Sequence, residues 1–188
     1  MLAGVGLALV AGACGIDPGG PESLPGGVVA PAVAPSPRDA PGTGADAGAR
    51  PVRIFLVAGS RLIDVPRTTP APDLVGTLQV LLEGPTAEEI SAGTRSAIAP
   101  GTRLRSARVE VGTAVIDLSR SFVDVGGEEQ ILAVAQLVLT ATTVPGVERV
   151  RLALEGEALE VPRADGTLAP GPLTGADYAS LRLERAPR

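Results

Sequence analysis

Few residues in this sequence could carry out chemistry, and their types exclude the common catalytic arrangements. Asp117 and Ser119 lie two residues apart, but the chain has no histidine and all 16 of its basic residues are arginine. A Ser-His-Asp triad and a Ser-Lys pair are therefore both excluded. We interpret Asp117 and Ser119 as groups that hydrogen-bond the backbone where a strand turns toward Phe122.

Clustered acids are the other candidate catalytic groups, because a glycosidase needs two carboxyl groups facing each other across a cleft. The clusters are Glu88 with Glu89, Glu128 with Glu129, and Glu155 with Glu157 and Glu160. The first two begin predicted helices, where the helix dipole favours acids, and the third flanks a predicted exposed turn. We interpret all three as solvated surface and predict that the protein is not an enzyme.

No cofactor or metal site is predicted either. Zinc sites rely on histidine and cysteine ligands, and the chain has no histidine and one cysteine. The pair Gly126-Gly127 precedes a predicted helix, but it lacks the spacing and the lysine of a phosphate-binding loop.

Five arginines are the candidate binding residues. Arg103, Arg105 and Arg108 fall on one predicted strand, and Arg149 and Arg151 on another. If these strands are neighbours, the arginines form a positive band suited to an anionic wall polymer or an acidic partner. The alternative is that they solvate the open face of a sheet and pair across strands with acids. Those acids are Glu110 and Glu148.

Composition narrows the class of partner. The net charge is −5, acids and arginines are interspersed, and aromatic residues make up 2% of the chain. Nucleic-acid binding is not expected without a basic stripe or aromatic platforms. The core must be built from Leu, Val, Ile and Ala.

The first fourteen residues have the pattern of an export signal. An apolar run over residues 2–10, too short to span a bilayer, leads into Ala11-Gly12-Ala13-Cys14. We predict a signal peptide over residues 1–13 and a diacylated Cys14, because the site resembles a bacterial lipobox. Two acyl chains give stable membrane anchoring. The sequence departs from the lipobox pattern in having Ala11 at the usual leucine position and no basic segment before the apolar run. The alternative is an ordinary cleavage site with an incidental cysteine.

Residues 14–51 are predicted to be a lipidated N-terminus followed by a disordered linker rich in Pro, Gly and Ala. Its prolines oppose both helix and central strand, and as a flexible coil it would span roughly 30 Å. Residues 52–183 are predicted to form the folded domain.

The domain is predicted to be α+β, with a single mixed β-sheet and two main helices packed on one face. Asp73 is the expected N-cap of a helix over 74–83, and Thr86 with Glu89 has capping-box spacing for a short helix over 87–92. A long apolar helix is expected over 128–143. The predicted strands cover 52–57, 62–67, 104–111, 113–118, 149–154 and 158–161.

Five short motifs in order resemble the GerMN domain, the sporulation and spore germination domain of bacterial envelope proteins. They are LIDVPR at 62–67, LLEGPT at 81–86, IAPGT at 98–102, IDLS at 116–119 and PGVERV at 145–150. One departure is the Ala99 before Pro100, where the family commonly has Ile-Pro directly. The use of arginine in place of lysine further indicates a GC-rich genome, and we infer a Gram-positive lipoprotein.

The resemblance implies a non-catalytic interaction module in the cell envelope with a link to sporulation or germination. We expect the module on the extracytoplasmic side of the membrane. Two functions stay open. The first is a protein–protein adaptor that uses a sheet edge or open face. The second is a binder of peptidoglycan or another wall glycan. Sugar binders usually stack their ligand on aromatic rings, which are scarce here, so we favour the adaptor.

Overall fold

Alternating apolar residues near the start of the domain form a hairpin. In the computed structural model, which describes residues 48–169 and 171–183, β1 (Arg50–Ala58) pairs antiparallel with β2 (Arg61–Thr69). A short β3 (Thr94–Arg95) joins the other side of β1, giving the order β2-β1-β3. β1 starts two residues before the predicted domain boundary, so Arg50 and Pro51 belong to the strand and not to the linker. The predicted signal peptide, Cys14 and the rest of the linker lie outside the described residues.

Two helices follow with the predicted caps. α1 (Leu74–Glu83) begins at Asp73, whose Oδ1 accepts the Gly76 N–H at 2.8 Å. α2 (Ala87–Ser91) begins with the capping box between Thr86 and Glu89. The Arg67 guanidinium also contacts the Glu89 carboxylate at 2.5 Å, and this hydrogen bond is the main reason why the pKa of Glu89 lies below its ordinary value. The ion pair holds α2 against β2.

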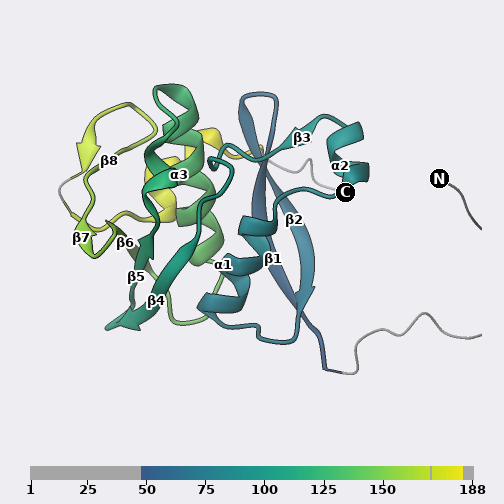
Figure 1. Ribbon diagram of the computed structural model, residues 1–188, viewed down its shortest axis with the longest axis horizontal. Coiled ribbons are helices and arrows are strands. Elements are labelled where there is room, and N and C mark those ends of the chain that lie inside the picture. The colour runs from purple at the N-terminus through teal and green to yellow at the C-terminus, as the bar shows by residue number, and fades with distance from the viewer. Residues whose placement is uncertain (1–47, 170, 184–188) are drawn as a thin grey trace, which may run out of the picture. The chain divides into compact units, whose positions relative to one another are not determined.

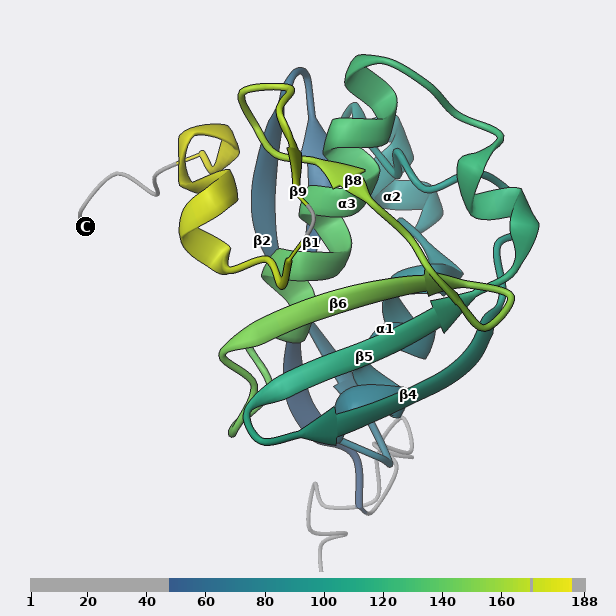
Figure 2. The same cartoon turned by 90° about the vertical axis from the view of Figure 1, so that its left-hand side faces the viewer.

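The second sheet is mixed, as predicted. It contains β4 (Leu104–Glu110), β5 (Thr113–Leu118), β6 (Arg149–Leu154) and the short β7 (Glu157–Ala158), in that order (Figure 2). β4 and β5 form an antiparallel hairpin. β5 and β6 are parallel, because the 3₁₀ helix η1 (Arg120–Val123) and α3 (Glu128–Ala141) connect them.

α3 forms the centre of the domain. Ten consecutive residues, 132–141, are buried, so the helix is covered on all sides. It packs against α1, and both helices also contact strands of each sheet. Figure 1 shows the two helices between the β1–β2 hairpin and the β4–β5–β6 sheet. None of the helices in the described residues is long and apolar enough to cross a bilayer.

The α+β class is confirmed, but the prediction of a single sheet with helices on one face is wrong. The reason lies at the outer edge of β1. The Phe55 N–H donates to Thr140 Oγ1 at 2.9 Å, Gln136 Nε2 donates to the Phe55 carbonyl at 3.0 Å, and Thr143 Oγ1 donates to the Arg53 carbonyl at 3.1 Å. Side chains of α3 thus occupy the hydrogen-bonding positions that a further strand would need.

The C-terminal part closes the core. It contains β8 (Val161–Pro162), β9 (Leu168–Ala169) and the 3₁₀ helix η2 (Gly175–Leu181). The predicted strand over 158–161 is therefore two short strands in different sheets, β7 and β8. Tyr178 on η2 is fully buried and donates its hydroxyl to the Pro162 carbonyl at 2.7 Å. Burial raises the pKa of Tyr178 well above its ordinary range.

Candidate interaction surface

The outward face of the β4–β5–β6 sheet is defined by the alternation of β5. Ala114, Ile116 and Leu118 point into the core and are fully buried. Thr113, Val115 and Asp117, which alternate with them, therefore point outward. Helices cover the inner side of this sheet, and Figure 2 shows the outer side facing the viewer without a covering helix.

Strand register brings the predicted arginines together on this outward face. Arg108 of β4 and Arg151 of β6 both pair with Val115, so the three residues form one row across the sheet. Arg149 occupies the neighbouring row, in register with Thr113. Arg108 and Arg151 are separated by one intervening strand, which places their Cα atoms about 10 Å apart. The two arginine strands are not direct neighbours, but their arginines share one face.

Two of these arginines have acidic partners. Arg105 Nε lies 3.3 Å from Asp117 Oδ2 on the next strand, and Arg108 Nε lies 2.6 Å from Glu110 Oε1 on its own strand. The predicted pairing with Glu110 thus occurs within β4 and not across strands. No ion pair of Glu148 is found among the described residues.

The two arginines of β6, Arg149 and Arg151, form no ion pair within the described residues. Arg149 Nη2 donates to the Val111 carbonyl at 3.4 Å, and the exposed Arg151 has no hydrogen bond or ion pair from its side chain within the described part of the chain. We call Arg105, Arg108, Arg149 and Arg151 the arginine face. Against Asp117 and Glu110 it holds an excess of two positive charges, although the whole chain has a net charge of −5.

Arg103 is the predicted site residue that lies outside this group, because it precedes β4. Its backbone is held by Ser119: the Arg103 N–H donates to Ser119 Oγ at 2.9 Å, and the Ser119 N–H donates to the Arg103 carbonyl at 3.0 Å. Asp117 Oδ1 accepts the Gly156 N–H at 2.9 Å. Asp117 and Ser119 therefore do bind backbone groups, but in neighbouring segments and not at the turn toward Phe122.

Two acids of the predicted clusters form ion pairs, and the third cluster, Glu155, Glu157 and Glu160, is exposed to solvent. Glu129 forms a two-point ion pair with Arg95, with N–O distances of 2.6 and 2.8 Å, and Glu89 pairs with Arg67 as described above. No group of three or more acidic or cysteine ligands with metal-binding geometry occurs among residues 48–169 and 171–183.

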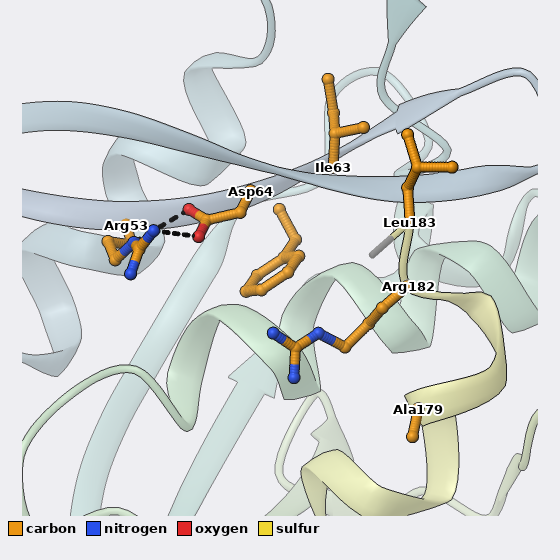
Figure 3. A pocket seen from close by; sticks show the side chains of 7 residues that line it. Arg53, Ile63, Asp64, Ala179, Arg182 and Leu183 are labelled. Atoms are coloured by element: carbon orange, nitrogen blue, oxygen red, sulfur yellow. Dashed lines mark hydrogen bonds and ion pairs between the residues drawn. The ribbon is translucent and has the colours of Figure 1, made fainter. Parts of the chain in front are cut away.

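A pocket that the sequence did not indicate lies between η2 and the β1–β2 hairpin. Its volume is about 750 Å³. The lining residues are Arg53, Phe55, Ile63, Asp64, Ala179, Arg182 and Leu183 (Figure 3). They come from both ends of the domain, so no local spacing in the sequence could have revealed the pocket.

The charged groups in this pocket already have partners. Arg53 Nε donates to Asp64 Oδ1 at 3.0 Å, and the dashed lines in Figure 3 mark this pair. The Arg182 guanidinium lies 5.4 Å from the centroid of the Phe55 ring, within the range of a cation–π contact. The arginine face, which has unpaired positive charge, is therefore the stronger candidate for binding.

All three aromatic side chains of the protein lie in the described part, and all are buried. Phe55 is 5% exposed, and Phe122 and Tyr178 are 0% exposed. No exposed ring is present on which a sugar could stack.

Comparison with known families agrees with this architecture. The Germane family model, described as "Sporulation and spore germination", matches residues 47–160, which include the arginine face and both main helices. The chain belongs to this family. The predicted resemblance is thereby confirmed, and a search of curated proteins gave no match.

Two solved structures from Bacillus subtilis are similar to this Germane-family chain. The first GerMN domain of the sporulation protein GerM has 25% identity and a TM-score of 0.52, and the match covers 66% of this chain and 97% of that one. The tandem GerMN domains of the same protein have 22% identity and a TM-score of 0.57, with 69% and 47% covered. The chain thus spans about half the length of the tandem structure. Neither the family description nor these names states a catalytic activity.

Proposed function

We propose that this Germane-family protein is a non-catalytic adaptor of the cell envelope that binds a partner protein through the arginine face, in a process linked to sporulation or germination. The observation that carries the proposal is the row formed by Arg108, Val115 and Arg151. Arg151 stands exposed in that row without an acidic neighbour in ion-pair contact. A local positive excess on an acidic protein attracts and orients an acidic partner surface.

The same proposal includes a location. Cys14 carries two acyl chains on the extracytoplasmic side of the membrane, and the chain between Cys14 and β1 tethers the domain to it. Each buried CH₂ contributes about 0.8 kcal/mol, so two chains anchor the protein stably. Replacing Cys14 by Ala should move the protein from the membrane fraction to the soluble fraction. Membrane retention of the Cys14→Ala variant would contradict the anchor.

The binding proposal is tested by crosslinking the full-length protein in intact cells and identifying the captured proteins by mass spectrometry. We compare Arg151→Glu with Arg50→Glu, which makes the same charge change on β1 of the other sheet. The Arg151→Glu variant should reduce the yield of a reproducible partner roughly tenfold, the change that 1.4 kcal/mol produces. The Arg50→Glu variant should leave the yield unchanged.

Equal yields for the two variants would exclude the arginine face as the adaptor surface. Wall binding is measured in parallel by sedimentation with purified peptidoglycan. If the protein sediments with the wall and crosslinking captures no protein partner, the adaptor proposal is wrong and the protein is a glycan binder. The buried aromatic rings argue against that outcome, because sugar binding modules usually present such rings to the ligand.

A further inference from the structure

β4 has an open edge. It is the end strand of its sheet, and its closing pair with β5 is Glu110 with Thr113 around the two-residue turn Val111-Gly112. Hydrogen-bonded and non-bonded pairs alternate from this closing pair, so the backbone groups of Ala107 and Val109 point away from β5. Outside the strand ladders, no hydrogen bond among the described residues uses the N–H or C=O groups of Ala107 or Val109.

The long edges of the other sheet are protected. On β1, side chains of α3 bind the backbone of Phe55. On β2, the Leu183 N–H donates to the Leu62 carbonyl at 2.8 Å, and Pro66 has no N–H to offer. Within the described residues, β4 therefore stands out as a long strand whose edge lacks such protection.

Side chains on β4 indicate what would pair there. The strand carries Arg108 and Arg105, and Glu110 is its one acid. Arg105 and Arg108 pair with Asp117 and Glu110, but their side chains stay 51% and 59% exposed, so each guanidinium has further N–H donors for a second carboxylate. On the inward side Val109, which pairs with the buried Ala114, is 46% exposed. A strand added beside β4 would place alternate side chains next to the arginines and next to Val109. The complementary sequence alternates acidic and apolar residues.

We propose that an extended segment of the partner protein, with alternating acidic and apolar residues, adds to β4 as a further strand. This inference rests on the proposed adaptor function and specifies its surface and the chemistry of its partner. Main-chain hydrogen bonds to Ala107 and Val109 supply affinity, and the arginines select acidic segments. A second copy of β4 is disfavoured, since pairing would bring two arginine-rich strands together.

The first test uses a blocked heptapeptide in which glutamate alternates with valine, and the same peptide with lysine in place of glutamate as the reference. Backbone amide exchange of the full chain is followed by NMR with and without peptide. At saturating glutamate peptide, exchange at Ala107 and Val109 should slow at least roughly tenfold. The lysine peptide should produce no such protection.

Val109→Pro is the sharpest variant, because it deletes an outward N–H while leaving the β4–β5 hydrogen bonds intact. It should abolish binding of the glutamate peptide without changing the denaturation midpoint appreciably. Val109→Thr keeps the N–H and serves as the matched control, which should still bind. If Val109→Pro does not fold, Arg108→Glu provides a second test, since it should reverse the preference from the glutamate to the lysine peptide.

Three results would overturn the proposal: retained binding by a folded Val109→Pro variant, shifts centred on Thr113 and Arg151 without protection of Ala107 and Val109, or no peptide binding. A dimer of the protein that is lost in Val109→Pro would assign the edge to a second copy instead. In cells, a partner lost by Arg151→Glu but kept by Val109→Pro would remove strand addition and leave the adaptor. If the peptide protects Ala107 and Val109 but no cellular partner is captured, the adaptor function is contradicted and strand addition to β4 is retained.

Discussion

Gly76 shows how a single residue is constrained by the packing around it. It lies in the first turns of α1, and a Cβ placed there would sit 1.9 Å from the carbonyl oxygen of Ala71. The approach of the loop before α1 is possible because glycine has no side chain. In the middle of a solvent-exposed helix, replacing glycine by alanine stabilises the folded state by about 0.5 to 1 kcal/mol.

We expect Gly76→Ala to have the opposite effect and to destabilise the domain by about 2 kcal/mol. The added Cβ clashes with the backbone of Ala71, which would have to move. Urea denaturation followed by circular dichroism measures the change. Gly126→Ala is the matched control, because no heavy atom lies within 4 Å of its added Cβ. A Gly76→Ala variant as stable as wild type would show that the loop before α1 can shift without cost.

Glu89 makes the stability of the domain depend on pH. Its hydrogen bond to Arg67 lowers its pKa below the ordinary value of 4.5. A lowered pKa in the folded state stabilises the protein above pH 4.5, and this contribution is lost as the pH falls through the folded-state value. We expect Glu89→Gln to lower the melting temperature at pH 7 but to have little effect below the lowered pKa. A difference that is the same at both pH values would contradict this role of the ion pair.

At the scale of elements, the main helices and hairpins could be predicted from local patterns. Asp73 before an apolar run and Thr86 three residues before Glu89 are caps that the chain uses as expected. In β5 the burial follows the alternation of the sequence, with every second side chain in the core. The two-residue strand β3 escaped prediction, because such short segments have no periodicity of their own.

Polar side chains on α3 bind backbone groups of β1 that another strand would otherwise use, and this keeps the two sheets apart. Gln136 is fully buried, donates to the Phe55 carbonyl at 3.0 Å and accepts the Ala97 N–H at 2.6 Å. It therefore joins β1 to the segment after β3. In the sequence it is one polar residue within a long apolar helix, and nothing local indicates which backbone groups it binds.

Replacing Gln136 by Leu should destabilise the domain by about 3 kcal/mol, because two buried backbone groups lose their partners. Equilibrium urea unfolding gives the value. Gln79→Leu, on the exposed side of α1, is the matched control and should change stability by less than about 0.5 kcal/mol. A small effect at Gln136 would mean that the Phe55 and Ala97 groups find other partners.

For the molecule as a whole, the folded unit extends past the region that the family model matches. The match ends at residue 160, but Val161, Leu173 and Tyr178 are at most 1% exposed and belong to the same core as α3. The chain after residue 160 therefore completes the domain and forms one wall of the pocket beside Phe55.

A chain that ends at Glu160 should lose its cooperative unfolding transition. Each large apolar side chain buried on folding contributes about 1.5 to 3 kcal/mol, and the total for the missing segment approaches the 5 to 15 kcal/mol of a typical domain. A chain that ends at Leu183 retains all the described contacts and should unfold like the full chain. Calorimetry compares the two. A cooperative transition in the shorter chain would show that the core forms without this segment.

The sequence by itself determined the helices, the hairpins, the α+β class and the family, since these follow from caps, periodicity and short motifs that act over a few residues. It also indicated the two arginine strands. Only the tertiary structure decided that β5 separates those strands while register places their arginines on one face. It likewise decided that α3 covers the edge of β1 and that β4 keeps an open edge. These features depend on pairings between residues far apart in the chain, which local patterns do not encode.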